Sequence, residues 1–118
     1  MNTSYYASPR IIGTEYKYEL ISISKKPPAW FTLPHKIYKP LCPSWKLVMN
    51  YKSGQITKEQ YTQYYHEEIL DSLDPARTYQ ELGENAVLLC WEKSNQFCHR
   101  HIVAKWLMDN LNIEITEL

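Results

Sequence analysis

The chain has 118 residues, 13 basic and 13 acidic side chains, and a hydrophobic fraction of 44%. This size fits one domain with its own core, and the composition excludes a collagen-like repeat and general disorder. The longest uninterrupted apolar run, Ala86 to Trp91, is too short to span a bilayer. We therefore expect one globular domain over residues 1–118 with no membrane partner.

The amino-terminal residues and the cysteines predict the cellular location. Met-Asn-Thr-Ser-Tyr-Tyr has neither the charged start nor the apolar stretch of a signal peptide. The three cysteines are an odd number, which is more typical of free thiols than of a disulfide framework. Together these features predict free thiols and a cytoplasmic protein.

The two halves of the chain differ in charge. Residues 1–60 hold nine basic and three acidic side chains (9 − 3 = +6), and residues 61–118 hold four and ten (4 − 10 = −6). Aromatic residues are interleaved with the basic ones. Basic groups attract phosphates and aromatic faces stack on bases, so this pattern is typical of single-stranded nucleic-acid or nucleotide sites. The alternative is that the halves pack together and scatter their charges over a neutral surface. The interleaved residues are Tyr5, Tyr6, Arg10, Tyr16, Lys17, Tyr18, Lys25, Lys26, Trp30, Phe31, His35, Lys36, Tyr38, Lys39, Trp45 and Lys46.

Two strands and one helix are expected in the first half. Residues 2–7 predict a short strand, and residues 18–24 predict a buried strand that ends before two prolines. Residues 27–43 carry five of the seven prolines, and so long a stretch without regular structure predicts either a functional cover or an element that the pattern does not show. Ser44 is a suitable cap for a short helix that runs through Tyr51.

The second half predicts a strand between helices. A capping box, Thr57-x-x-Gln60, opens one helix, and Asp74-Pro75 opens a shorter one that Gly83 ends. The apolar segment 86–91 predicts a central strand covered on both faces. A helix over 97–111 and an alternating strand over 113–117 follow it.

A strand, a helix and a second strand in about 30 residues form a βαβ unit, which implies parallel strands. We therefore expect an α/β domain of the Rossmann-like, three-layer kind, with a small, mostly parallel sheet flanked by helices.

The residues capable of chemistry cluster between the central strand and the long helix. Alternation in the strand puts Cys90 and Glu92 on one face and Trp91 on the other, and Cys98 and Arg100 open the helix. In open α/β sheets, ligands bind beyond the carboxyl ends of the strands. Helix amides and the Arg100 fork favour an anion there. This position predicts a crevice that binds an anionic ligand.

Three residues of this cluster are the candidate catalytic groups. Cys98 at the helix start is a predicted nucleophile, because the helix field favours its thiolate. His99 shares a helix face with apolar residues and is expected to point toward the sheet, where Glu92 can orient it for proton transfer. His101 lies on the opposite side and is expected to face water. The simpler alternative is a structural network of Glu92, His99 and Arg100 that ties the strand to the helix. In that case Cys90 is an inert core thiol and Cys98 a buried residue of the first helical turn.

Other chemistries have weaker support. Cys42, Cys90, Cys98 and one histidine could supply soft metal ligands, but no Cys-x-x-Cys pair exists. Neighbouring residues such as Cys98 and His99 are also unusual ligands of one ion. The sequence holds no glycine-rich phosphate loop, no Gly-x-Ser-x-Gly elbow and no Cys-x5-Arg loop. We therefore expect no metal and no cofactor.

The cluster also carries a family resemblance. Val87-Leu-Leu-Cys90-Trp-Glu92-Lys93, followed by Phe97-Cys98-His99-Arg100-His101, resembles the defining motif of a bacterial and phage family, domain of unknown function 488 (DUF488). The resemblance covers nearly the whole chain and implies a compact Rossmann-like fold. In the commoner branch, the first two strands end in a Gly-x-Ser-type and an Asp-x-Arg-type motif. In this chain the corresponding positions look like Thr3-Ser4-Tyr5 for the first motif and Ser22-Ile-Ser24-Lys25 for the second.

Two functions follow from these observations. The first is a small enzyme or ligand-binding domain that acts on a phosphorylated or nucleotide-like ligand beneath the 27–43 cover. Its catalytic residues would be Cys98, His99 and Glu92, and its ligand-binding residues Arg100, Ser24, Lys25, Tyr5 and Cys90. The second is a non-catalytic module that binds nucleic acid or a protein through the basic, aromatic half. The reaction and the oligomeric state do not follow from the sequence.

Overall fold

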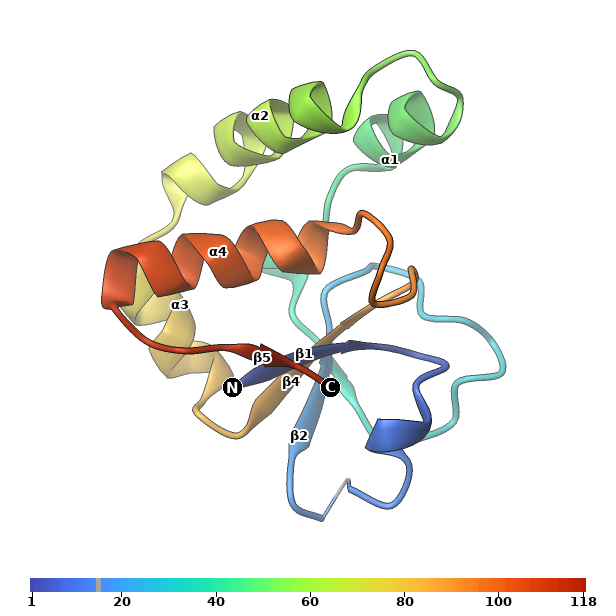
Figure 1. The fold of residues 1–118 in the computed structure, drawn as a ribbon, viewed down its shortest axis with the longest axis vertical. Coiled ribbons are helices and arrows are strands. Elements are labelled where there is room, and N and C mark those ends of the chain that lie inside the picture. Colours follow the sequence, from blue (N-terminus) through green and yellow to red (C-terminus); the bar gives the residue numbers. More distant parts are fainter. Residues whose placement is uncertain (15) are drawn as a thin grey trace.

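The framework of the protein is a five-stranded parallel sheet, seen in a computed structural model that describes residues 1–14 and 16–118 (Figure 1). The strands lie in the order β3-β2-β4-β1-β5. Central β4 pairs with both β1 and β2, so strands from both charge halves share one sheet. The predicted α/β class with a parallel sheet is confirmed. The strands are β1 (Asn2–Tyr5), β2 (Glu19–Ser22), β3 (Lys36–Ile37), β4 (Ala86–Cys90) and β5 (Thr116–Glu117).

The apolar sequence of β4 accounts for its central position. All five of its residues are buried, because each face of the strand packs against a different cluster. Ala86, Leu88 and Cys90 face the helices, whereas Val87 and Leu89 face the other side of the sheet. This alternation places the side chain of Cys90, at the carboxyl end of the strand, under the helical layer.

Three of the four helices begin at the residues that the sequence predicts, whereas the last begins at His99, two residues after the predicted start. Ser44 accepts a hydrogen bond from the Leu47 amide, and both bonds of the capping box between Thr57 and Gln60 are present. Asp74 caps the next helix in the same way. The helices are α1 (Trp45–Lys52), α2 (Lys58–Glu68), α3 (Pro75–Leu82) and α4 (His99–Leu111).

The two faces of the sheet are covered differently. All four α-helices contribute to the core on one face, and Figure 1 shows them on the same side of the sheet. The opposite face is covered by a short 3₁₀ helix, Pro9–Ile11, and by loop residues such as Phe31, which pack on Leu20 and Leu89. The three layers are therefore helices, sheet and loops.

Of the two interpretations of residues 27–43, the structureless cover is wrong and the unassigned element is correct. Lys36–Ile37 forms edge strand β3 beside β2, and a 3₁₀ helix follows at Lys39–Leu41. Phe31 packs against Tyr6 on the sheet face that carries no α-helix. The prolines on either side of this strand indicate breaks in regular structure. They are compatible with it because an edge strand pairs on one side only, so fewer of its amides are needed for hydrogen bonds.

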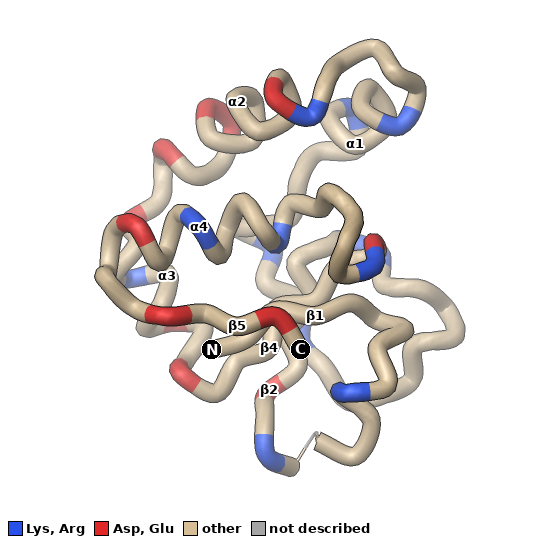
Figure 2. Tube along the Cα trace, viewed as in Figure 1, with Lys and Arg blue, Asp and Glu red and all other residues tan. Residues whose placement is uncertain are grey.

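The charges lie on separate elements of the helical layer. Both charged residues of α1 are lysines, whereas α2 carries three glutamates and one lysine (Figure 2). Two of the nine basic residues of the first half therefore lie on α1, the helix beside the carboxyl ends of the central strands. Within the described residues, no helix has the length and apolar character needed to cross a membrane.

Candidate functional site

A cavity of about 560 Å³ lies where β2 and β4 end, between these ends and α1. Five of the predicted site residues line it, namely Ser24, Lys25, Glu92, Cys98 and His99. The predicted position of a crevice beyond the carboxyl ends of the strands is therefore the position of this cavity. The other lining residues are Lys26, Pro43, Trp45, Val48, Tyr51, Lys52, Tyr61, Trp91 and Phe97.

The outer wall of the cavity comes from α1 and α2 rather than from the proline-rich segment. Trp45, Tyr51 and Lys52 project from α1, and Tyr61 projects from the start of α2. Of residues 27–43, only Pro43 is among the described lining residues, so the predicted cover over the pocket is a further error. The ring of Tyr51 packs on Phe97, which fixes α1 against the loop before α4.

His99 forms part of the inner wall and is held in one tautomer. Its ring is buried, and Nε2 lies 2.7 Å from the carbonyl oxygen of Ile23. Burial lowers the pKa of His99 to about 4, although the bond to Ile23 opposes that shift. The ring is therefore neutral near pH 7. A carbonyl can only accept, so Nε2 carries the proton and Nδ1 keeps a free lone pair.

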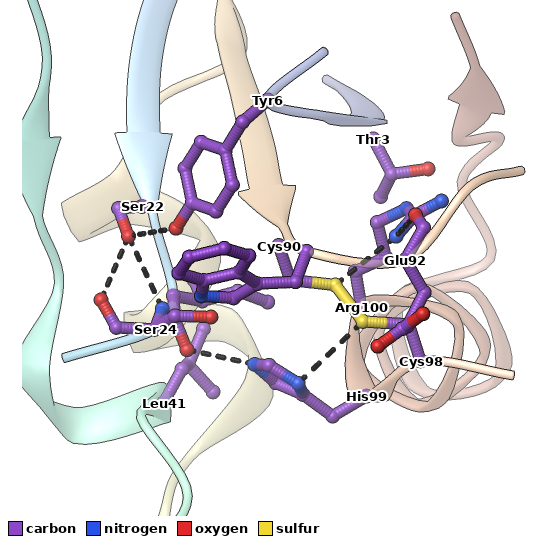
Figure 3. Close-up of a disulfide and its surroundings, with 12 residues drawn as sticks. Thr3, Tyr6, Ser22, Ser24, Leu41, Cys90, Glu92, Cys98, His99 and Arg100 are labelled. Carbon is purple, nitrogen blue, oxygen red and sulfur yellow. Dashed lines mark hydrogen bonds between the residues drawn. A yellow bond between two sulfur atoms is a disulfide. The ribbon is translucent and has the colours of Figure 1, made fainter. Parts of the chain in front are cut away.

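The Nδ1 atom of His99 faces the sulfur of Cys98 across 3.8 Å (Figure 3). Neighbouring residues converge in this way because Cys98 is the N-cap of α4. Its backbone is extended (φ −153°, ψ 149°), whereas His99 already lies in the helix. The expectation that neighbouring Cys98 and His99 are unusual ligands of one ion therefore does not hold at this cap, where the two side chains converge.

The prediction of free thiols is wrong for two of the three cysteines. Cys90 and Cys98 are joined by a disulfide, and Cys42 is free and buried. The fold brings the first two together because β4 ends at Cys90 and α4 begins beside it. Burial raises the pKa of Cys42 to about 11, so this thiol is protonated near pH 7.

Three soft ligand atoms meet at this point of the fold. The two sulfurs of Cys90 and Cys98 and one nitrogen of His99 all lie within 4.8 Å of one another, and all three residues are buried. Cys42 is not part of this group in the described structure. Two cysteines and a histidine are ligands that zinc prefers, so these are the residues that can hold a metal ion.

Arg100 takes a structural position instead of lining the cavity. Its side chain is fully buried, and its Nη2 donates to Glu117 Oε2 at 2.7 Å. Nη1 donates to the Glu92 carbonyl at 2.7 Å and to the Cys90 sulfur at 3.1 Å. Most of its donors are thus already engaged. Arg100 ties the strand to the helix as the structural alternative predicted, but its carboxylate partner is Glu117 rather than Glu92. His99 bonds to Ile23 instead.

Glu117 and Tyr5 complete the surroundings of Arg100. Burial alone would raise the pKa of Glu117, but hydrogen bonds from Arg100 and Thr3 lower it below the ordinary range. The Tyr5 ring lies 5.9 Å from the Arg100 guanidinium carbon. Tyr5 and Glu117 line a separate, smaller hollow. Three predicted ligand-binding residues, Tyr5, Cys90 and Arg100, are therefore not among the described lining residues of the main cavity.

Two orientation predictions differ from the structure. Trp91 was placed on the face opposite Glu92, yet both line the cavity, because the strand ends at Cys90 and its alternation stops there. The Trp91 indole donates to the Lys26 carbonyl at 3.2 Å. His101 is half-buried instead of facing water, and its Nε2 is buried without a hydrogen-bond partner in the described structure.

Sequence reasoning missed most of the aromatic wall. The interleaving of aromatic and basic residues in the first half includes Trp45, but we assigned it to the nucleic-acid alternative rather than to the crevice. Phe97 and Trp91 flank the cysteine motif directly, and this proximity was the available signal. Tyr51 and Tyr61 reach the cavity through the packing of α1 on α2, which the sequence does not specify.

Comparison with known proteins identifies the family to which the chain belongs. Comparisons with the curated proteins and with the solved structures give no match. One family model matches residues 17–111, which include the cavity lining and both cysteines of the disulfide. That model, DUF488-N3a, is described as the active DUF488-N3 subclade, and the chain belongs to the DUF488 family.

Proposed function

We propose that this chain is a small enzyme or ligand-binding domain for an anionic, nucleotide-like ligand, and that the ligand occupies the 560 Å³ cavity. The observation that carries the proposal is the lining: five aromatic residues and three lysines surround one cavity. Its volume lies within the range of about 300–1,000 Å³ typical of small-molecule sites. Aromatic faces stack on a base, and ammonium groups attract phosphate.

The lysines favour an anion at the mouth of the cavity. Lys25, Lys26 and Lys52 are exposed, whereas Glu92 is the one carboxylate among the described lining residues. The lysine ammonium groups are in contact with solvent at the mouth of the cavity, where they attract a phosphate electrostatically. The ligand would therefore point its phosphates toward these lysines and its apolar part toward the aromatic wall.

The chemistry would take place at the inner wall. Glu92 supplies a carboxylate for proton transfer, and His99 presents the unprotonated Nδ1. Reduction of the disulfide would give Cys98 a thiol that faces this nitrogen and the cavity. A thiolate in such surroundings attacks a substrate or binds a metal ion.

A single-stranded nucleic acid is the second candidate occupant, favoured by one observation. Trp45 and Trp91 line the cavity and yet are 72% and 49% exposed, so they offer stacking faces beyond the space of one nucleotide. If that ligand is correct, a short oligonucleotide binds more tightly than a mononucleotide, and its affinity falls steeply with salt.

The test is calorimetric titration of the reduced protein with nucleosides, nucleoside phosphates, sugar phosphates and inorganic phosphate. Trp45→Ala is expected to weaken nucleotide binding about 5- to 150-fold, the equivalent of about 1–3 kcal/mol for a stacked base. Lys52→Ala is expected to weaken phosphate-bearing ligands more than nucleosides.

Two matched variants serve as controls. Trp30→Ala removes another exposed tryptophan (60% against 72% for Trp45), and Lys46→Ala removes another lysine of α1. Neither residue is among the described lining residues of the cavity. Both variants should bind as the wild type does. Equal effects of Trp30→Ala and Trp45→Ala, or the absence of binding by any anionic compound tested, would refute the proposal.

A further inference from the structure

We propose that the reduced protein binds one zinc-class metal ion through Cys90 Sγ, Cys98 Sγ and His99 Nδ1, and that the fourth coordination position opens on the cavity. The two sulfurs and a ring nitrogen of His99 lie within 4.8 Å of one another, all three residues are buried, and Nδ1 lies 3.8 Å from the Cys98 sulfur (Figure 3). Four-coordinate zinc has bonds of about 2.3 Å to sulfur and about 2.0 Å to nitrogen. The sulfur atoms must separate for this geometry, which reduction permits.

The histidine is already prepared as a ligand. Metal-binding histidines usually donate their second ring N–H to a carbonyl or carboxylate, which fixes the tautomer. His99 has this arrangement, because Nε2 donates to the Ile23 carbonyl at 2.7 Å and Nδ1 faces the Cys98 sulfur. The Tyr65 ring packs on the imidazole, with its centroid 5.6 Å away, and limits its rotation.

The surroundings of Cys90 also suit a metal-bound thiolate. Arg100 Nη1 donates to the Cys90 sulfur at 3.1 Å, and charged donors stabilise a sulfur that has lost its proton. The charge of Arg100 is in turn balanced by Glu117. Two thiolates neutralise a divalent cation, so the buried group as a whole carries no net charge. This balance matters because an unpaired charge is costly to bury.

The open position gives the ion a function. Cys98 and His99 line the cavity, whereas Cys90 lies behind them, so the side of the cluster without a ligand faces the cavity and Glu92. Three protein ligands and one free position are typical of catalytic zinc sites, where the free position holds water or substrate. A phosphate or carbonyl oxygen of the ligand would fit this position.

The conversion between the two states is balanced. A dithiol reductant transfers two electrons and two protons to the Cys90–Cys98 bond, which breaks to give two thiols, while the reductant closes its own disulfide. The divalent cation then displaces both thiol protons, which pass to solvent. Oxidation and metal binding therefore exclude each other, since both use the same sulfur lone pairs.

The experiment uses Co²⁺ as a spectroscopic substitute for Zn²⁺. The full chain is reduced with a tertiary phosphine, which takes up the oxygen of one water, and is then titrated with Co²⁺. We expect one ion per chain, a thiolate-to-cobalt charge-transfer band, and loss of that band when Zn²⁺, the stronger binder, is added. The unreduced protein is a control without any mutation, and it should show no such band.

Matched variants locate the site. Cys98→Ser and His99→Gln are each expected to weaken Co²⁺ binding by about 100-fold. Loss of a residue that only supports a metal ligand typically costs about 10- to 100-fold, and loss of a ligand itself should cost at least as much. Cys42→Ser and His101→Gln remove the same side-chain types outside the ligand set and should leave binding unchanged. Circular dichroism of the metal-free variants confirms that they are folded.

The contrary outcomes are equally specific. A charge-transfer band of the same strength in the unreduced protein would refute the site, as would its absence after complete reduction of the wild type. Equal weakening by Cys42→Ser and Cys98→Ser would place the ion elsewhere. Because Co²⁺ binding requires no nucleotide, its failure leaves the proposed ligand of the cavity to be judged on its own titrations.

Discussion

His99 and Arg100 are neighbours in the sequence, and both are buried, but they belong to opposite regions of the molecule. His99 lies at the cavity, where its Nδ1 faces a sulfur and its Nε2 donates to the end of β2. Arg100 lies on the other side of α4 and binds Glu117 on β5. One region has an unused ring nitrogen beside open space, and the other has a guanidinium with most of its donors engaged.

This difference shows how to separate a binding group from a supporting group. Arg100 is the more conspicuous residue in the sequence, since it is one of four basic residues in the acidic half. Its hydrogen bonds to Glu92, Cys90 and Glu117 instead connect β4, α4 and β5. Chemical capacity therefore depends on which atoms remain unsatisfied beside a cavity and not on the residue type alone.

Removal of the partner of Arg100 has the largest expected effect on stability. Glu117→Gln leaves a fully buried guanidinium without its counterion, and breaking a buried pair typically costs about 3–5 kcal/mol. Glu117 is partly exposed, so we expect a loss of about 3 kcal/mol in the free energy of unfolding. Urea denaturation measures it, with Glu114→Gln as the matched control because Glu114 is exposed on the same segment. Equal losses in both variants would contradict the structural role of the pair.

The same pair predicts how stability depends on pH. The pKa of Glu117 lies below its ordinary value in the folded protein: burial opposes this shift, but hydrogen bonds from Arg100 and Thr3 outweigh it. A carboxyl with a depressed folded pKa stabilises the fold above its unfolded pKa and loses that contribution as the pH falls through the folded pKa. As the pH falls below the ordinary pKa of a glutamate, the wild type should therefore lose more stability than Glu117→Gln. Parallel pH profiles for the two proteins would contradict this assignment.

Local patterns were sufficient to predict most of the fold. The caps at Ser44 and Thr57 and the apolar run of β4 each depend on residues within one element, so their outcome does not require tertiary information. The edge strand β3 was missed because its two residues form a strand only beside β2. Its position depends on a long-range pairing that has no local signal.

For the candidate site, the position of the reactive residues was predictable from the sequence, but their contacts with one another were not. The position of Glu92, Cys98 and His99 follows from the rule for parallel sheets, and the cavity contains all three. The bond between Cys90 and Cys98 and the convergence of Cys98 with His99 depend on the extended backbone at the N-cap, which residue spacing does not reveal. The pairing of Arg100 with Glu117 requires knowledge that β5 returns beside β1.

The smallest expected effect concerns the support of His99. The Tyr65 hydroxyl donates to the Leu41 carbonyl at 2.6 Å, and its ring packs on the imidazole. Tyr65→Phe removes the hydrogen bond but keeps the ring, so we expect a loss of about 1 kcal/mol in the free energy of unfolding. Tyr64→Phe removes a hydroxyl from the exposed neighbour and should leave that free energy unchanged. Because the ring still packs on His99, the Tyr65→Phe protein should keep the Co²⁺ spectrum of the wild type. A changed spectrum would show that the hydroxyl, and not the ring, holds His99 in place. The groups that support the reactive side of α4 would then include a hydrogen bond made by α2.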